Sequence, residues 1–286
     1  AARFSFEGEQ KAYTALYPRD IGICSLGILA SEDEQLLQNL KVSLANLTLA
    51  QSHLGQFPFY YKPQENIKQW RTPGSLDSSL WWCIAFLLYY EKTGDQEFYK
   101  KYLSHLDRAF GWLAYQDTNN DFLLEQGEAA DWADEMPRQG IVLYTNALWY
   151  YLVSLRIRVE KRSDFESLKE AVSEGVNTLF WIHKQKDSNI SYIPKNWYTH
   201  NQLYANGLIE FVNSQIVYLP YYLSFVGHKT YELRCDTLGN ILACLVGLAD
   251  ERKTQLIIQH ITQSGSNLPY PVTALYPPIF PGEPDW

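Results

Sequence analysis

The chain has 286 residues, with 24 Lys and Arg against 32 Asp and Glu, and a formal net charge of −8 at pH 7. This acidic balance excludes the basic patch that nucleic acid or an acidic membrane surface would attract. Aromatic residues make up 15% of the chain, including 9 Trp and 21 Tyr. Because Trp and Tyr combine a flat apolar ring with a polar atom, this surplus predicts an aromatic-lined cavity for a small neutral or cationic ligand.

Cysteine and histidine spacing gives no sign of a metal or cofactor site. The four cysteines lie in apolar helical stretches and are predicted to be reduced core residues: Cys24, Cys83, Cys235 and Cys244. The six histidines form no HExxH or clustered pattern, so no metal and no cofactor is expected. We find no apolar run of the roughly 18 residues that a membrane span needs and no signal peptide at Ala1, which favours the cytoplasm.

Apolar residues at helical spacing predict consecutive pairs of helices along most of the chain. The expected ranges are 21–30 with 33–52, 77–93 with 95–115, 142–160 with 164–184, and 206–226 with 231–248, followed by 250–262. In each pair one helix is apolar nearly all round and the other has a single apolar face. This alternation predicts an all-α, (α/α)6-type toroid of inner and outer helices, forming a single domain over residues 1–286. Short strands are expected at 57–61 and 189–193.

Two segments place carboxylates beside tryptophans where a loop meets a helix. The first contains Asp77, Trp81 and Trp82, and the second contains Asp131, Trp132, Asp134 and Glu135. Glycoside hydrolysis uses one carboxylic acid to protonate the leaving oxygen and a second carboxylate on the other face of the sugar ring. Tryptophan offers a flat surface to a pyranose and raises the pKa of a neighbouring carboxyl by excluding water. Asp77 could equally cap its helix, and the acidic run could be a solvated loop.

A third segment, Tyr17-Pro18-Arg19-Asp20, precedes the first apolar helix. Pro18 disfavours a helical Tyr17, so the helix is expected to begin at Ile21 with Asp20 as its cap. Capping does not explain Arg19, whose planar guanidinium suits paired sugar hydroxyls or a carboxylate.

The segment from Asp117 to Glu128 has acids and amides at the spacing of an EF-hand loop. Phe122 occupies the sixth position, where that loop requires glycine. An Asx-rich turn is therefore expected here in place of a calcium site.

Together these segments resemble the six-hairpin glycosidases, most closely the alkaline and neutral invertases and the glucosidase domain of glycogen debranching enzymes (amylo-α-1,6-glucosidase). The residues that carry the resemblance are Tyr17-Pro18-Arg19-Asp20, Leu76-Asp77-Ser78-Ser79-Leu80-Trp81-Trp82, Trp132-Ala133-Asp134, Asp236-Thr237-Leu238-Gly239-Asn240 and Tyr276-Pro277-Pro278-Ile279. In order and spacing the likeness covers nearly the whole chain.

The resemblance implies two rival positions for the general acid. Asp77 matches the invertase acid, whereas Asp134 lies where the debranching domain has its acid. The resemblance also implies a last helical hairpin beyond Trp286 that bears the partner glutamate, so the toroid is expected to be incomplete at the C-terminus as given. Ser79 replaces an invertase glycine, and its added hydroxymethyl group is expected to alter the pocket.

The sequence thus predicts a glycosidase that cleaves a glucosidic bond in a small oligosaccharide or at a glucan end, with inversion. Asp77 or Asp134 would donate the proton, and the remaining residues would contact the sugar: Arg19, Asp20, Trp81, Trp82, Asp131, Trp132 and Glu135. One alternative is a carbohydrate-binding or interaction protein that keeps the toroid without catalysis. Another is a sugar epimerase or isomerase that uses His200 and His228. The oligomeric state is left open.

Overall fold

The computed structural model describes residues 3–6, 9–12, 14–70, 75–133, 136, 138–182, 218–227, 230–269 and 272–283. The chain divides into two compact units. Unit 1 comprises Ala1–Tyr115, Ala130–Trp132 and Arg158–Glu160, and unit 2 comprises Gln116–Ala129, Ala133–Ile157 and Lys161–Trp286. A single domain over 1–286 stays a prediction.

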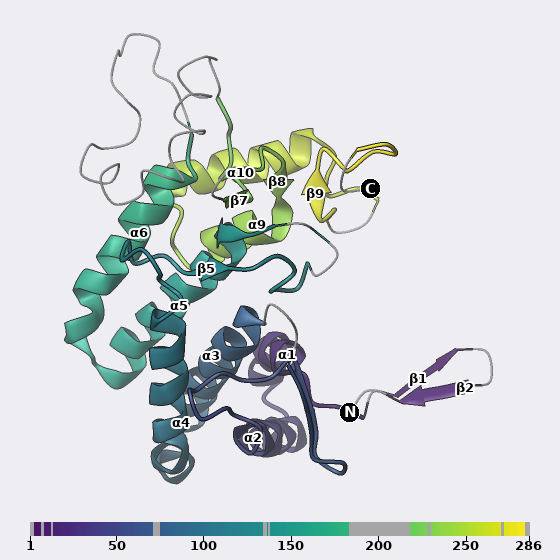
Figure 1. Ribbon diagram of the computed structural model, residues 1–286, viewed down its shortest axis with the longest axis vertical. Coiled ribbons are helices and arrows are strands. Elements are labelled where there is room, and N and C mark those ends of the chain that lie inside the picture. The colour runs from purple at the N-terminus through teal and green to yellow at the C-terminus, as the bar shows by residue number, and fades with distance from the viewer. Residues whose placement is uncertain are drawn as a thin grey trace. The chain divides into compact units, whose positions relative to one another are not determined.

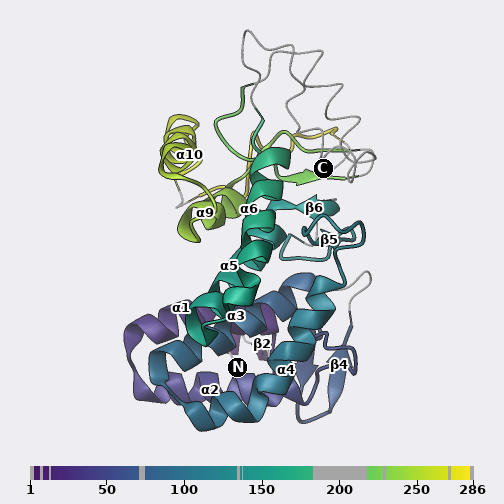
Figure 2. The same ribbon diagram turned by 90° about the vertical axis from the view of Figure 1, so that its left-hand side faces the viewer.

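Unit 1 is built on four helices. They are α1 (Pro18–Ser31), α2 (Glu34–Thr48), α3 (Leu76–Thr93) and α4 (Gln96–Ala114). Helix α3, which is buried over most of its length, packs against α1, α2 and α4 (Figure 2). The carboxylates of Asp33 and Asp95 cap α2 and α4, and Gly94 ends α3 at φ +67°. These boundaries confirm the two helical pairs expected in this part of the chain.

The core of unit 1 is a stack of aromatic rings centred on α3. The Trp82 ring stacks on Phe57 at a centroid distance of 4.4 Å and on Phe86 at 5.1 Å. Gly22 of α1 lies so close to Trp81 that an added Cβ atom would come within 2.4 Å of the Trp81 Cβ atom. The absence of a side chain at Gly22 therefore permits the close approach of α1 to α3.

Two antiparallel hairpins also belong to unit 1 (Figure 1). They are β1 (Arg3–Phe6) with β2 (Glu9–Ala12), and β3 (Tyr60–Lys62) with β4 (Ile67–Gln69). The strand expected at 57–61 is thus present only at its C-terminal end. The strand expected at 189–193 lies outside the described residues.

Unit 2 contains α5 (Leu143–Glu160, whose last three residues belong to unit 1), a 3-10 turn η1 (Ser163–Phe165), α6 (Glu166–Leu179), α9 (Thr237–Leu245) and α10 (Glu251–Gln263). Its strands are β5 (Glu125–Gln126), β6 (Gly140–Val142) and β7 (Phe225–Val226), which form one antiparallel sheet, and β8 (Cys235–Asp236) with β9 (Leu275–Tyr276). Helix α9 packs against α10 (Figure 1).

Three expected helices of unit 2 need correction. The helix predicted at 164–184 begins with η1 and ends at Leu179. Residues 206–217 of the predicted helix 206–226 lie outside the described residues, and its end is the strand Phe225–Val226. The predicted helix 231–248 begins only at Thr237, because the preceding residues form a strand and the Asp236 carboxylate caps α9 by accepting from the Gly239 N–H. Asp250 likewise caps α10, which confirms the helix expected at 250–262.

All four cysteines are free, and Cys83 and Cys235 are buried as predicted. Cys24 is exposed and Cys244 is only partly buried, so these two do not match the prediction of core residues. Among the described helices, none combines the length and apolar character required to cross a membrane. Within the same residues, no group of three or more His, Cys, Asp or Glu side chains could hold a metal ion.

Candidate functional site

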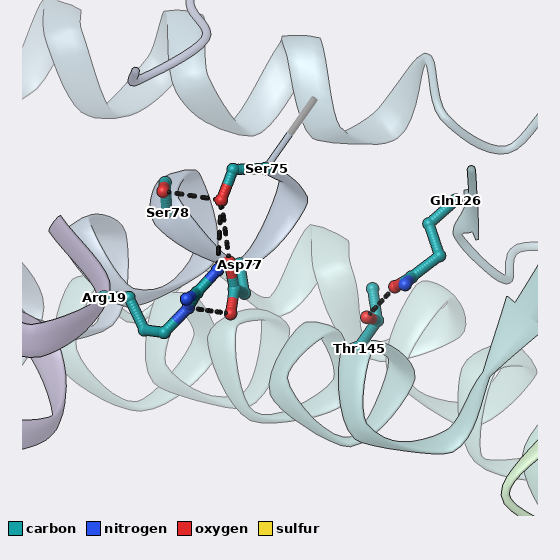
Figure 3. Close-up of polar contacts among 6 residues, drawn as sticks. All are labelled: Arg19, Ser75, Asp77, Ser78, Gln126 and Thr145. Atoms are coloured by element: carbon teal, nitrogen blue, oxygen red, sulfur yellow. Dashed lines mark hydrogen bonds and ion pairs between the residues drawn. The ribbon is translucent and has the colours of Figure 1, made fainter. Parts of the chain in front are cut away.

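The centre of the candidate site is an ion pair between Arg19 and Asp77 in unit 1 (Figure 3). The Arg19 Nε–H donates to Asp77 Oδ2 at 2.5 Å, and Nη2 donates to Oδ1 at 2.9 Å. The Asp77 side chain is 0% exposed, whereas that of Arg19 is 13% exposed. This two-point geometry fixes the orientation of the guanidinium plane and holds its positive charge against the carboxylate.

Two serine hydroxyls extend this ion pair (Figure 3). Ser75 donates from Oγ to Asp77 Oδ1 at 3.1 Å and accepts from Arg19 Nη2 at 3.2 Å. Ser78 donates from Oγ to Ser75 Oγ at 3.0 Å. Both serines are buried, so the cluster is a connected polar network inside unit 1.

Burial and charge act in opposite directions on Asp77. Loss of water around the carboxylate raises the pKa of Asp77, and the Asp131 charge raises it further. The Arg19 guanidinium and the Ser75 hydroxyl both favour the charged form and lower the pKa. Burial has the largest effect, so the pKa of Asp77 is raised, and the ion pair with the part-buried Arg19 limits this rise.

Helix α1 begins at Pro18, three residues before the predicted start, with Tyr17 at the cap position. Proline is well suited to the first helical turn because it has no N–H to leave unbonded. Asp20 consequently lies in the first turn of α1 and is not its cap. Asp20 is exposed at the surface, but neighbouring atoms exclude part of the water around its carboxyl. This desolvation raises the pKa of Asp20, and the Arg19 charge opposes the rise.

The two tryptophans that follow Asp77 are core residues and not pocket walls. Trp82 is 1% exposed, lies in the ring stack with Phe57 and Phe86, and donates its Nε1–H to the Leu44 carbonyl at 3.1 Å. Trp81 is buried where α3 meets α1. The prediction that these indoles contact sugar is therefore not supported by their position, because burial leaves them no accessible face.

Ser79 differs from its expected role in a similar way. Its side chain is fully buried, and its hydroxyl accepts a hydrogen bond from the Phe57 N–H at 3.0 Å. The hydroxymethyl group therefore satisfies a backbone donor within the core and does not alter the shape of a pocket.

A second aromatic group, which the sequence did not single out, lies beside Arg19. The guanidinium carbon is 5.6 Å from the centre of the Phe59 ring. Tyr17 packs edge-on against Phe59 at 5.7 Å and lies 5.4 Å from Tyr60. All three rings are partly exposed, unlike Trp81 and Trp82. The aromatic residues within Phe57–Tyr61 are the sequence signal that could have identified this group.

The segment that carries the other candidate acid is linked to the start of α3. The Leu76 N–H donates to the Ala130 carbonyl at 2.9 Å, and the next residue, Asp131, is fully buried. Asp131 lies close enough to Asp77 to raise the pKa of its carboxyl. Trp132 is half-buried. Asp134 and Glu135 lie outside the described residues.

The loop after Asp117 forms the expected Asx-type turns. The Asp117 carboxylate accepts from the N–H groups of Asp121 and Phe122 at 3.0 and 2.9 Å, and Asp121 Oδ1 accepts from the Leu123 N–H at 2.8 Å. Phe122 adopts φ +71°, a left-handed conformation that usually favours glycine. Burial raises the pKa of Asp121 to about 6.

Unit 2 has its own buried polar pairs. Arg138 Nη1 donates to Asp236 Oδ2 at 2.7 Å, with the guanidinium over the Tyr144 ring. Thr145 donates to Gln126 Oε1 (Figure 3). The first pair joins the cap of α9 to the segment before β6, and the second joins α5 to β5.

The chain is similar to solved structures in its fold, although comparisons of its sequence find no match. No protein-family profile matches the chain, and no curated protein matches it significantly in sequence. In contrast, a mannosylglycerate hydrolase of glycoside hydrolase family 63 from Thermus thermophilus, solved in complex with glucose, superposes with a TM-score of 0.64 at 12% identity, over 94% of this chain and 75% of that one. An uncharacterised conserved protein from the same organism gives a TM-score of 0.64 at 12% identity, over 94% and 74%. The chain therefore shares the mostly helical toroid fold of the Thermus hydrolase.

Unit 1 brings together three of the residues expected at the site, Arg19, Asp77 and Asp131. Trp81 and Trp82 are buried in the core of the same unit. The histidines of the epimerase alternative, His200 and His228, lie outside the described residues.

Proposed function

We propose that this protein is a glycoside hydrolase that cleaves a glucosidic bond in a short oligosaccharide or at a glucan end. A shared fold does not by itself define an activity, so the proposal depends on the site. The observation that carries it is the buried Arg19–Asp77 pair, coupled to Asp131 at the start of the segment that leads to Asp134.

The partly exposed rings beside Arg19 support a carbohydrate ligand. Tyr17, Phe59 and Tyr60 offer apolar faces with which the C–H groups of a pyranose can pack. Arg19, fixed in orientation by Asp77, is suited to hold a pair of sugar hydroxyls, and Asp20 supplies an exposed carboxylate in the same turn. In this arrangement the aromatic rings take the role that the sequence analysis gave to Trp81 and Trp82.

We assign proton donation to Asp134 and a binding role to Asp77. Both oxygens of Asp77 already accept hydrogen bonds from Arg19, and its side chain has no exposed surface. A general acid must instead be protonated and within reach of the leaving oxygen. Asp134 holds the position of the debranching-enzyme acid in the resemblance, three residues after Asp131. The bond between Leu76 and Ala130 supports the assignment because it ties the start of this segment to the helix that carries Asp77.

The glucosyl specificity is proposed on two grounds. The invertase and debranching resemblances both concern bonds to glucose, and the Thermus protein of the same fold was solved with glucose.

The reaction is proposed to proceed with inversion: Asp134 protonates the leaving oxygen while a second carboxylate activates water on the opposite face of the ring.

The test is a screen of sucrose, maltose, isomaltose and short glucans for release of reducing sugar. The wild type is compared with Asp134→Asn and with a matched control, Asp33→Asn, because asparagine caps α2 as well as aspartate does. We expect hydrolysis by the wild type and the control, and a loss of about 100-fold or more in Asp134→Asn.

Unchanged activity in Asp134→Asn would contradict the assignment of the acid. Sugar binding in calorimetry without release of product would favour the carbohydrate-binding alternative. Interconversion of two sugars without bond cleavage would favour the epimerase alternative.

A further inference from the structure

One hydroxyl group contacts both members of the buried ion pair. Ser75 Oγ donates to Asp77 Oδ1 at 3.1 Å and accepts from Arg19 Nη2 at 3.2 Å. The Ser78 Oγ–H donates to Ser75 Oγ at 3.0 Å. Ser75 thus uses its single proton on the carboxylate while its lone pairs receive two donors.

These contacts distinguish Ser75 from an ordinary helix cap. It occupies the N-cap position of α3, where a serine hydroxyl usually accepts from a backbone N–H two or three residues later. Here Ser75 makes no such side-chain capping bond. Its hydroxyl is directed to Asp77 and Arg19, although the sequence places it at a favourable capping site.

We propose that Ser75 is a positioning residue, which holds the Arg19–Asp77 pair in the orientation that binds the sugar. This inference rests on the glycosidase function proposed above. Without the Ser75 hydroxyl, Asp77 Oδ1 loses one donor and Arg19 Nη2 loses one acceptor. The guanidinium can then tilt relative to the carboxylate plane, which weakens a two-point contact to sugar hydroxyls.

The hydrogen-bonded chain Ser78–Ser75–Asp77 predicts the sign of the effect that Ser75 has on the pKa of Asp77. Each hydroxyl donates toward the carboxylate, so the chain stabilises the charged form of Asp77. Removal of the Ser75 hydroxyl therefore raises the pKa of Asp77, consistent with the lowering effect of Ser75 on that carboxyl. A serine that only filled space would not alter this titration.

The experiment compares Ser75→Ala, Ser75→Thr and the wild type by two measurements. The first follows the carboxyl ¹³C signal of Asp77 against pH, assigned through its absence in Asp77→Asn. The second is the KM and kcat for the best sugar substrate. In Ser75→Ala we expect the Asp77 titration to move to higher pH and KM to rise about three- to tenfold, with a smaller change in kcat. Ser75→Thr, which keeps the hydroxyl, is expected to restore both values.

Ser25→Ala is the matched control. Ser25 is also fully buried, in α1, but its hydroxyl donates to the Gly22 carbonyl at 2.6 Å and not to the pair. We expect this change to leave the Asp77 titration and KM as in the wild type. If Ser75→Ala does not fold, Ser78→Ala provides the second variant, and its effect is expected to be smaller and in the same direction.

An Asp77 titration in Ser75→Ala that coincides with the wild type would overturn the inference. A shifted titration with unchanged KM would overturn the link to sugar binding. The titration needs no substrate, so failure of the glycosidase proposal is distinguishable from failure of the role of Ser75.

Discussion

Asn146 and Asn240 make the same set of backbone hydrogen bonds at the fourth residue of their helices, α5 and α9. Asn146 Nδ2 donates to the carbonyls of Val142 and Leu124, and its Oδ1 accepts from the Leu124 N–H at 2.7 Å. Asn240 does the same with Asp236 and with Tyr222, whose N–H lies 2.8 Å from Oδ1. Each amide thus joins a helix start to a loop residue, 22 or 18 positions earlier.

Ser79 continues this pattern in unit 1. It is the fourth residue of α3, and its hydroxyl accepts from the N–H of Phe57, again 22 positions earlier. Three helices whose starts are buried therefore fasten the loop that precedes them by one side chain at the same helical position. This shared hydrogen bond is a structural repeat. The sequence does not reveal it, because α3 has serine where α5 and α9 have asparagine.

We predict that Asn146→Leu and Asn240→Leu each lower the free energy of unfolding by about 2–4 kcal/mol. Each substitution leaves a buried backbone N–H and two carbonyls without their amide partner. Urea unfolding followed by circular dichroism measures the loss. Asn39→Leu, at an exposed position of α2, is the control and should change stability by less than about 0.5 kcal/mol. Equal effects at buried and exposed sites would contradict the prediction.

Alanine substitutions at two glycines of α1 should have opposite effects. A Cβ atom at Gly22 would lie 2.4 Å from the Trp81 Cβ and 2.9 Å from its carbonyl oxygen, whereas at Gly27 it would meet nothing within 4 Å. We expect Gly22→Ala to destabilise by about 1–3 kcal/mol and Gly27→Ala to stabilise by about 0.5–1 kcal/mol. Thermal unfolding midpoints check both. A stabilising Gly22→Ala would mean that α1 and α3 do not approach closely at this point.

The buried carboxyl of Asp121 should make stability depend on pH. Its pKa is raised by burial to about 6, so the folded state binds this proton more tightly than the unfolded state does. The stabilising contribution is complete below about pH 4 and is lost as pH rises through about 6. Asp121→Asn, which cannot ionise, should therefore gain stability relative to the wild type by on the order of 2 kcal/mol between pH 4 and pH 7. Denaturant unfolding at several pH values measures this difference, and a constant difference would refute it.

The dependence of the hydrolysis rate on the leaving group should distinguish the roles proposed for Asp134 and Asp77. An activated aryl glucoside departs with little need for a proton, whereas a disaccharide requires one. We expect Asp134→Asn to lose about 100-fold or more on a disaccharide but less than about tenfold on dinitrophenyl glucoside. Asp77→Asn should reduce both rates by a similar factor, since it disturbs Arg19 and not proton transfer. The reverse pattern would assign the acid to Asp77.

Local signals in the sequence were sufficient for much of the secondary structure. The caps Asp33, Asp95 and Asp250 act through backbone N–H groups three residues away, and Gly94 ends its helix through its own φ angle. Such interactions depend on neighbours in the chain, which a sequence displays directly. The predicted start of α1 was three residues too late. The residue before a proline favours an extended conformation, but proline itself is well suited to the first turn of a helix.

The sequence by itself determined the all-helical class, the paired helices and the segments that hold the candidate acids, because hydrophobic spacing and capping act over short distances. Only the tertiary structure decided what those side chains do. Asp77 is paired with Arg19, 58 positions away, and Trp82 is enclosed by Phe57 and Phe86. Whether a carboxylate contacts a guanidinium, or an indole is exposed to solvent, depends on which helices pack together. Packing brings together residues that lie far apart in the chain, and the sequence does not indicate which of them are in contact.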